Sequence, residues 1–509
     1  MNRRHFLGMA SSAVAAGTLA SSPLAAAQTG TQKSGAGNAG SRPNFLFFIA
    51  DDLMFRTIGT LNNPEVHTPN IDRLLARGCA FTHCFHQGSW TGAVCVASRT
   101  MLNTGLTTFK AHAITNENQA GDVATWGQTL RGGGYDTYIT GKWHLDAVFL
   151  QRSFAEQGPV GPGYLPSTND MYNRPAPGNH WDPANEQLKG HWLMTSLVEN
   201  EKPGKIEHSS SVYADAAVEH LTTKVAHRDT PFFMYVGFNA PHDPRQAPQE
   251  FLDMYPTDKI AIPPNFVPEH PFDQGEHKTR DELLAPFPRT PFDVQTHRRE
   301  YYAIITHMDR QIGRILDALE ASGKADNTYV ILTADHGLAV GEHGLMGKQN
   351  QYECSMRMPL ILAGPGIPKG KRVDEMVYQH SMFATTCELA GVPVPETVGF
   401  PSLVPMIHGE PEPIYDAMFG WLETLQRSVR TKTHKLIYYT KIQRYQLFNL
   451  EQDPWEMHDL SNDPQHDALK LQLVARLRAM QQELGDPITV PDPPKQSAAL
   501  ASAQEACCA

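Results

Sequence analysis

Two kinds of segment alternate along the first four hundred residues of the chain. Continuous apolar runs of strand length occur at 44–50 (NFLFFIA), 231–238 (PFFMYVGF) and 328–334 (TYVILTA), and a further strand is predicted at 135–140 (YDTYIT). Segments with apolar residues at helical spacing separate them, at 67–78, 125–134, 211–227 and 297–323. Buried strands that alternate with helices predict an α/β fold, with a large mixed, mainly parallel sheet sandwiched by helices.

The pattern changes after residue 405. Short alternating strands are predicted within 428–440 and 444–454, followed by a helix at 466–484. We therefore expect a main domain over 42–405, a smaller C-terminal subdomain with an antiparallel sheet over 406–490, and a disordered tail over 491–509. Two further segments, 145–210 and 243–295, are rich in Pro, Gly, His, Asp and aromatic residues and lack periodicity. They are predicted to be long loops, which commonly carry specificity.

The amino terminus has the pattern of an export signal. Arg3 and Arg4 precede a mildly apolar run rich in Ala, Ser and Gly, which ends in small residues before a predicted cleavage after Ala27. The arginine pair resembles a bacterial twin-arginine signal, with an ordinary secretory signal as the alternative. Residues 28–41 are predicted to be a flexible linker. We expect a periplasmic or secreted protein that uses export machinery and, because no apolar run reaches about 20 residues, has no membrane span.

Charge and cysteine content narrow the class further. The formal net charge is −11, and removal of the leader, which holds two arginines and no acid, lowers it to −13. Such a chain lacks the basic footprint of a nucleic-acid-binding protein. Its seven cysteines show no zinc-binding spacing. Cys79 and Cys84 are close enough to suggest a disulfide in an oxidising compartment, and the odd count makes Cys95 the candidate for an unpaired cysteine.

Reactive side chains follow four of the predicted strands. They are Asp51 and Asp52 after 44–50, Lys142 and His144 after 135–140, His242 after 231–238, and Asp335 and His336 after 328–334. Ligands bind at the carboxyl ends of strands in such sheets, so we expect one shared site. The three aspartates suit a hard divalent cation, to which His336 would add a nitrogen. A helix cap would explain one aspartate but not an adjacent pair with a third acid at another strand end.

Cys95 and Arg99 belong to a second candidate element. If a helix begins at this point, the two residues share a face one turn apart, at an end that favours anions. A thiol is a poor ligand for a hard cation, so an unmodified Cys95 does not match the predicted metal site. Lys142 and His144 are two positions apart and would face the same side of an extended segment. The histidine could move a proton near neutral pH.

These motifs together resemble the type I sulfatases of the alkaline phosphatase superfamily. The resemblance rests on CVASRTMLNTG at 95–105, which is similar to the family signature, and on DDL (51–53), GKWH (141–144), APH (240–242), DHG (335–337), GK (347–348) and LFNLEQDPWEMHDL (447–460). It implies that a maturase converts Cys95 to formylglycine, whose hydrate attacks the sulfate sulfur. The family usually has proline where this chain has Ala97, which leaves open which maturase acts.

The resemblance also implies a role for each site residue. Asp51, Asp52, Asp335 and His336 would bind calcium, with magnesium as the alternative. Arg99 would hold the formylglycine diol, and His144 would deprotonate it to release sulfate. Lys142, His242 and Lys348 would bind sulfate oxygens, and His242 or Lys348 would protonate the leaving oxygen.

The implied reaction is hydrolysis of a sulfate monoester on a small molecule or glycan. His180, Trp181, Trp192 and Arg245 lie in the long loops and could contact a sugar, with loop packing as the equal alternative. Phosphonate monoester or phosphodiester hydrolysis and choline sulfate hydrolysis are the alternative activities implied by the same resemblance. A non-catalytic binding protein is disfavoured, because every position of the expected site is occupied.

Overall fold

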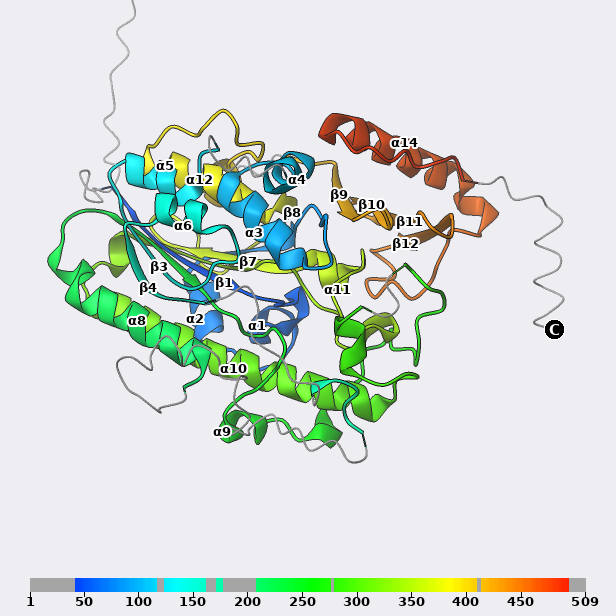
Figure 1. Ribbon diagram of the computed structural model, residues 1–509, viewed down its shortest axis with the longest axis horizontal. Coiled ribbons are helices and arrows are strands. Elements are labelled where there is room, and N and C mark those ends of the chain that lie inside the picture. The colour runs from blue at the N-terminus through cyan, green and yellow to red at the C-terminus, as the bar shows by residue number, and fades with distance from the viewer. Residues whose placement is uncertain are drawn as a thin grey trace, which may run out of the picture. The chain divides into compact units, whose positions relative to one another are not determined.

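A mixed eight-stranded sheet forms the centre of the computed structural model, which describes residues 42–116, 123–161, 171–176, 207–275, 279–409 and 413–493 (Figure 1). Its strands are β1 (Asn44–Ala50), β2 (Cys79–Phe85), β3 (Asp136–Lys142), β4 (Glu156–Gly161), β5 (Phe232–Gly237), β6 (Thr328–Ala334), β7 (Arg357–Ala363) and β8 (Lys371–Tyr378). The order is β4-β3-β5-β1-β6-β7-β2-β8, and β7 alone runs antiparallel to its neighbours. The carboxyl ends of β1, β3, β5 and β6 therefore meet at one edge.

Helices cover both faces of this sheet (Figure 1). One layer contains α3 (Val94–Thr104), α5 (Trp126–Gly132) and α12 (Met382–Ala390), and the other contains α2 (Pro69–Arg77), α8 (Ser209–Thr223) and α10 (Pro291–Ala321). Shorter helices are α1 (Gly59–Asn62), α4 (Thr108–Asn116), α6 (Ala147–Ser153), α9 (Gln249–Leu252), α11 (Glu353–Met356) and α13 (Val404–His408). Every residue of β1 is buried, which explains its continuous apolar sequence. The Phe47 ring, for example, packs edge-on against Trp126 of α5 at 4.8 Å.

A four-stranded antiparallel sheet follows the main sheet in the chain. Its strands are β9 (Ala417–Leu422), β10 (Gln426–Thr431), β11 (His434–Tyr439) and β12 (Arg444–Asn449), in the order β12-β11-β10-β9. Helix α14 (Asp467–Leu484) packs on it through Leu473 and Leu477, which share a core cluster with Val429 of β10. A hydrogen bond of 2.7 Å from Trp421 Nε1 to Thr108 Oγ1 connects the smaller sheet to the main domain.

The predicted fold class is confirmed, and β1 and β6 have the predicted bounds. Helix α10 begins at Pro291, six residues before the predicted start at 297, because Thr290 and Asp293 form a capping box ahead of the apolar stripe. The prediction of a loop throughout 145–210 was wrong, since α6 and edge strand β4 lie there. The predicted leader, linker and most of the tail, together with His180, Trp181 and Trp192, lie outside the described residues.

The suggested disulfide between Cys79 and Cys84 was also wrong. Both thiols are free and buried, and both belong to β2. Five positions along an extended strand span about 16 Å at about 3.3 Å per residue, whereas disulfide-linked Cα atoms lie about 4.4–6.8 Å apart. The two cysteines are therefore too far apart in the strand to form a disulfide, although they are close in sequence.

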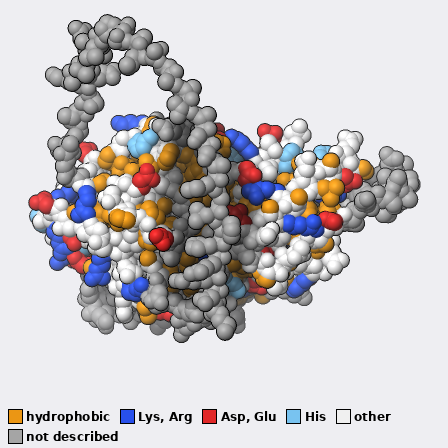
Figure 2. All heavy atoms as spheres, turned by 90° about the horizontal axis from the view of Figure 1, so that it is seen from above, with side chains coloured by type: hydrophobic (Ala, Val, Ile, Leu, Met, Phe, Trp, Pro, Cys, Tyr) orange, Lys and Arg blue, Asp and Glu red, His pale blue; other side chains and the backbone are white. Residues whose placement is uncertain are grey.

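Within the described parts of the chain, no helix combines the length and the apolarity needed to cross a membrane. Figure 2 shows acidic and basic side chains interspersed among the described residues of one face.

Candidate active site

Three buried carboxylates meet at the carboxyl edge of the main sheet. Asp51 and Asp52 follow β1, and Asp335 follows its neighbour β6, with which β1 pairs in parallel up to Ala50 and Ala334. The backbone N–H of Asp52 donates to Asp335 Oδ1 at 3.2 Å. Asp52 has a φ of 69°, a left-handed conformation that aspartate tolerates better than most residues. The turn directs two successive carboxylates into the same space.

The carboxylates and two imidazoles form a set of donors suited to a hard cation. One ligand atom from each of Asp51, Cys95, Asp335 and His336 lies within 4.8 Å of the others, and Asp51, Asp52 and His242 form a second such group. Asp51 Oδ1 and Asp52 Oδ2 are buried with no hydrogen-bond partner among the described residues. Orphaned buried oxygens of this kind are costly unless a cation satisfies them.

His336 presents one ring nitrogen to this set. Its Nδ1 donates to the Gly337 carbonyl at 2.9 Å, which leaves Nε2 as the ring nitrogen that can face a cation. That atom lies 3.3 Å from Asp52 Oδ1 and 3.6 Å from Asp335 Oδ1. A backbone hydrogen bond that fixes the tautomer and ring orientation is typical of metal-ligating histidines. The residues present therefore fit a divalent cation.

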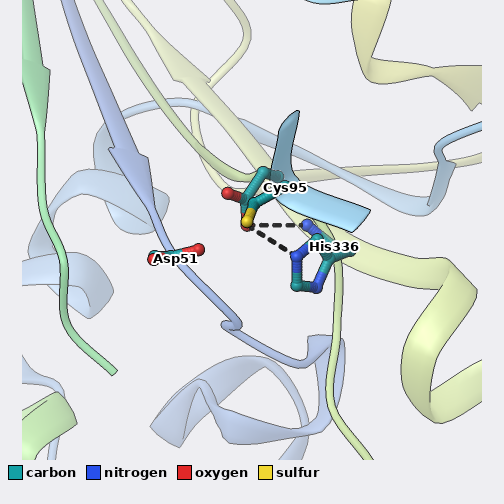
Figure 3. A group of neighbouring side chains, drawn as sticks. Asp51, Cys95 and His336 are labelled. Carbon is teal, nitrogen blue, oxygen red and sulfur yellow. Dashed lines mark hydrogen bonds and ion pairs between the residues drawn. The ribbon is translucent and has the colours of Figure 1, made fainter. Parts of the chain in front are cut away.

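Cys95 faces the carboxylates from the first turn of α3. Figure 3 shows its sulfur directed at His336, with the Asp51 carboxylate on the adjacent side. No side chain caps the amino end of α3, so the backbone N–H groups of its first turn, apart from Val96 N–H, which donates to the Ala93 carbonyl, are available to an anion at position 95. Burial opposes ionisation of the thiol, but the charges of Lys142 and Lys348 outweigh it and lower the Cys95 pKa to about 7. The position is built to stabilise negative charge.

Arg99, one turn along α3, holds this helix against the ends of β6 and β3. Its Nε donates to Asp335 Oδ2 at 2.8 Å, and its Nη1 donates to the Lys142 carbonyl at 3.0 Å. The Ser98 hydroxyl donates to the Asp335 carbonyl at 2.6 Å and accepts from Gln379 Nε2 at 2.5 Å. The nucleophile candidate and the metal-ligand candidates thus share one hydrogen-bonded frame.

Three cations balance the three carboxylates. Lys142 pairs with Asp51, Lys348 pairs with Asp52 at 2.8 Å, and Arg99 pairs with Asp335. All six groups are buried, so the interactions are weakly screened. Burial and the nearby Asp335 nevertheless raise the pKa of Asp51 well above its usual value, and burial raises that of Asp52 to about 6. An added divalent cation would make the cluster positive overall, which suits an anionic substrate.

His144 and His242 lie on the cavity side of this cluster. His144 has a φ of 66°, so the chain turns at this residue instead of continuing extended as predicted. Burial, with the charges of Lys142 and Arg99, lowers its pKa to about 2, so the ring is neutral. His242 donates from Nδ1 to the Asp243 carbonyl at 2.7 Å and turns Nε2 toward Asp52 at 3.9 Å. Burial and the charge of Lys348 hold its pKa well below the usual value.

A cavity of about 470 Å³ opens onto the cluster. Four predicted site residues line it: Cys95, His144, His242 and Lys348. Sequence reasoning missed the other polar side chains of the lining, which are Tyr172, Thr279, Arg280, Asp281 and Gln349. All but Gln349 lie in the two segments predicted to carry specificity. Arg245, a proposed sugar contact, is 2% exposed and packs against His297 and Tyr301, in agreement with the loop-packing alternative.

The fold, taken together with the family comparison, identifies a sulfatase of the alkaline phosphatase superfamily. The sulfatase family model matches residues 43–392, and a model described as the C-terminal part of N-sulphoglucosamine sulphohydrolase matches residues 341–483. The chain belongs to the sulfatase family and is a sulfuric ester hydrolase.

Similar proteins extend over most of the chain. A sulfatase from Formosa agariphila is 27% identical over 83% of this chain and 82% of its own length, and a choline-sulfatase from Rhizobium meliloti is 27% identical over 83% of each chain. A solved structure described as a complex with its substrate D-glucosamine-2-N,6-O-disulfate has a TM-score of 0.68, 21% identity, and covers 89% of this chain and 100% of its own. A phosphonate monoester hydrolase from Silicibacter pomeroyi also has a TM-score of 0.68, at 19% identity, covering 88% and 96%.

Proposed function

We propose that the protein hydrolyses sulfate monoesters with a nucleophile at position 95. Cys95 is first converted to formylglycine, and the aldehyde of formylglycine is hydrated to a gem-diol. One observation carries the proposal. A buried cysteine occupies the uncapped amino end of a helix, between a hard-cation site and a cavity lined by histidine and lysine. A thiol has no evident use beside such a cation, whereas a diol oxygen suits it. Sulfate transfers to one diol oxygen, the alcohol departs, and collapse of the other hydroxyl to the aldehyde releases sulfate.

The chain's own residues supply the binding and proton steps. Lys142 and Lys348 hold sulfate oxygens and offset negative charge as it develops. His144, which lines the cavity, accepts the proton of the second diol hydroxyl. Lys348, whose ammonium lines the cavity, protonates the leaving alcohol. His242 is the less suitable donor, because its pKa is well below the usual value and its Nδ1–H is bonded to the Asp243 carbonyl. Arg99 keeps α3 aligned with Asp335 and holds the diol.

Asp51, Asp52, Asp335 and His336 are the residues proposed to hold the metal, with calcium preferred to magnesium. A cation bound there would polarise the sulfate and favour deprotonation of the nucleophile. Three carboxylates give it hard oxygen ligands, and the flexible coordination of calcium accommodates the additional nitrogen of His336.

The proposed substrate is a sulfated carbohydrate encountered outside the cytoplasm. The predicted leader, with its arginine pair, supports export. A maturase would act on the 95–99 motif before the protein is exported. The fold shared with a structure that binds a disulfated glucosamine supports the substrate class.

Mass spectrometry of the peptide that contains Cys95 tests the mechanism. Conversion of the thiol to the aldehyde lowers the mass by about 18 Da, because sulfur is replaced by oxygen and two hydrogens are lost. Natively expressed protein is expected to show this shift, and the Cys95→Ala variant is expected to lose turnover of 4-nitrophenyl sulfate. An unmodified thiol in fully active protein would contradict the mechanism.

Phosphonate monoester hydrolysis is the second candidate, since a structure of that activity has the same fold. The kcat/KM values for an aryl sulfate and for the matching aryl phosphonate, measured on the same preparation, separate the two. Preference for the phosphonate would replace the proposed substrate while leaving the site assignment in place.

A further inference from the structure

The cavity wall contributed by the long loops is polar and rigidly held. We name as the loop wall the side chains Tyr172, Thr279, Arg280, Asp281 and Gln349, all of which line the cavity with Cys95. Backbone hydrogen bonds from Asn173 N to Leu283 O (2.8 Å) and from Arg174 N to Leu284 O (3.0 Å) connect its two loop segments. The Arg174 guanidinium binds Glu300 of α10 through two nitrogens, at 2.9 and 2.7 Å. The loop wall is therefore anchored to the scaffold.

Arg280 is the central group of the loop wall. Its guanidinium pairs with Asp243, and its Nη1 donates to Asp281 Oδ1 at 2.6 Å. Gln349 Nε2 donates to the other oxygen of Asp281 and to the Gly92 carbonyl, both at 2.9 Å. The Arg280 side chain remains 38% exposed. Its hydrogen bonds to described residues use Nη1 and one N–H of Nη2, which leaves Nε–H and the other Nη2–H without a partner among those residues. Two directed donors therefore remain for a ligand.

The charges of this wall disfavour a second anion on the substrate. Arg280 is its only cation among the described residues, and it is already paired with two buried carboxylates, Asp243 and Asp281. A second sulfate or a carboxylate would approach these acids without an unpaired cation to compensate for its lost hydration. Neutral hydroxyl groups are not repelled by these carboxylates and lose less hydration free energy than an anion. They can also form hydrogen bonds with the guanidinium and carboxylate groups of the loop wall, which offer donors and acceptors side by side.

Thr279 adds a hydroxyl to the wall. Its Oγ1 is buried and forms no hydrogen bond with the described residues, although the side chain lines the cavity. A buried hydroxyl without a partner is costly, and a ligand hydroxyl would satisfy it.

We propose that the loop wall binds the hydroxyl groups of an uncharged sugar ring that carries the sulfate, with Arg280 and Thr279 donating hydrogen bonds and Asp281 accepting them. The wall thereby selects monosulfated neutral sugars over sugars with a second anionic group. This inference rests on the proposed sulfatase function and specifies its substrate class.

The test compares matured wild-type protein with Arg280→Gln and Thr279→Val. Substrates are 4-nitrophenyl sulfate, which has no sugar hydroxyls, a set of glucose and galactose monosulfates, and D-glucosamine-2-N,6-O-disulfate. Arg73→Gln is the matched control, because Arg73 is also 38% exposed and ion-paired, with Asp317 at 2.9 Å, and lies on α2 away from the cavity. Thermal unfolding checks that each variant is folded, and Thr279→Val remains informative if Arg280→Gln is not.

We expect the best monosulfate to exceed the disulfate in kcat/KM by at least about tenfold, which is the effect of about 1.4 kcal/mol. Each loop-wall variant should lower kcat/KM for that monosulfate about 10- to 100-fold, and several-fold more than for 4-nitrophenyl sulfate, because the lost hydrogen bonds involve only the sugar. Arg73→Gln should lower neither. Equal losses on both substrates, or a wild-type preference for the disulfate that Arg280→Gln abolishes, would overturn the assignment. Absence of any sulfate ester turnover by matured wild type would instead refute the proposed function, and this inference with it.

Discussion

Gln379 shows how single side chains outside the cavity position the reacting groups. Its Nε2 donates to Ser98 Oγ on α3 and, at 3.0 Å, to the Asp335 carbonyl at the end of β6. The residue is fully buried and is not among the residues that line the cavity. It therefore connects the helix of the nucleophile to the strand of a metal-ligand candidate.

We predict that Gln379→Met lowers kcat for 4-nitrophenyl sulfate at least about tenfold while KM changes little, because displacement of about 1 Å between reacting groups can cost about 100-fold. The formylglycine content, measured by mass spectrometry, should stay at the wild-type level. Gln311→Met is the control, since Gln311 is a buried glutamine of α10 bonded to His307 and Arg314. A kcat equal to that of the control variant would exclude this positioning role.

Metal removal tests the cluster of carboxylates. Dialysis against EDTA should abolish turnover and lower the midpoint of thermal unfolding, because a cation bound only by the folded site stabilises the folded state and supplies Lewis-acid chemistry there. Added calcium should restore both quantities, and elemental analysis establishes the metal content. Full activity in protein shown to be metal-free would refute the metal assignment.

At the scale of elements, the strand ends were the predictable part of the site. Asp51 and Asp335 could be located because continuous apolar runs define where buried parallel strands stop. Arg280 and Asp281 could not, because the position of their loop depends on hydrogen bonds to a segment more than 100 residues earlier, such as Asn173 N to Leu283 O. No local periodicity encodes such a contact. The left-handed turn at His144 likewise has no glycine to signal it.

Helix α2 provides a test of element stability. Its own N-cap residue, Thr68, makes no capping hydrogen bond from its side chain. Asp309 of α10 replaces it, accepting from Ile71 N at 2.8 Å and from Asn70 N at 3.1 Å. Burial raises the pKa of Asp309 to about 6, against the opposing effect of these hydrogen bonds.

A raised pKa in the folded state means that folding favours the protonated form of Asp309. Stability from this group is therefore present below the unfolded pKa near 4 and is lost as the pH rises through about 6. We predict that wild type loses up to about 3 kcal/mol of unfolding free energy relative to Asp309→Asn between pH 4 and pH 7, at about 1.4 kcal/mol per pKa unit. Chemical denaturation at several pH values measures the difference. Asp317→Asn, at an exposed position on the same helix, should show no comparable trend.

At the scale of the whole molecule, a buried ionic cluster joins the two sheets. Lys435 of β11 binds Glu353 Oε1 and Glu456 Oε1, both at 2.8 Å, and donates to the Gln351 carbonyl at 3.0 Å. Burial disfavours ionisation of Glu353, but the charges of Lys435 and Arg430 outweigh it and keep its pKa well below the usual value. The loop from Lys348 to Glu353 thus extends from the sulfate-binding candidate to this cluster.

We predict that Lys435→Met destabilises the protein by about 3–5 kcal/mol, since it leaves the buried Glu456 carboxylate without its cation and removes one of the cations paired with Glu353. Because the cluster anchors the loop that carries Lys348, the variant should also show a higher KM for 4-nitrophenyl sulfate with unchanged formylglycine content. Lys432→Met is the matched control, because Lys432 is 58% exposed and pairs with Glu375 at 3.1 Å, an interaction worth at most about 1 kcal/mol. Denaturation followed by circular dichroism gives the stabilities. Equal stabilities of Lys435→Met and Lys432→Met would contradict this role. The ionic cluster would then not be the interaction that anchors the smaller sheet and the substrate-binding loop to the main domain.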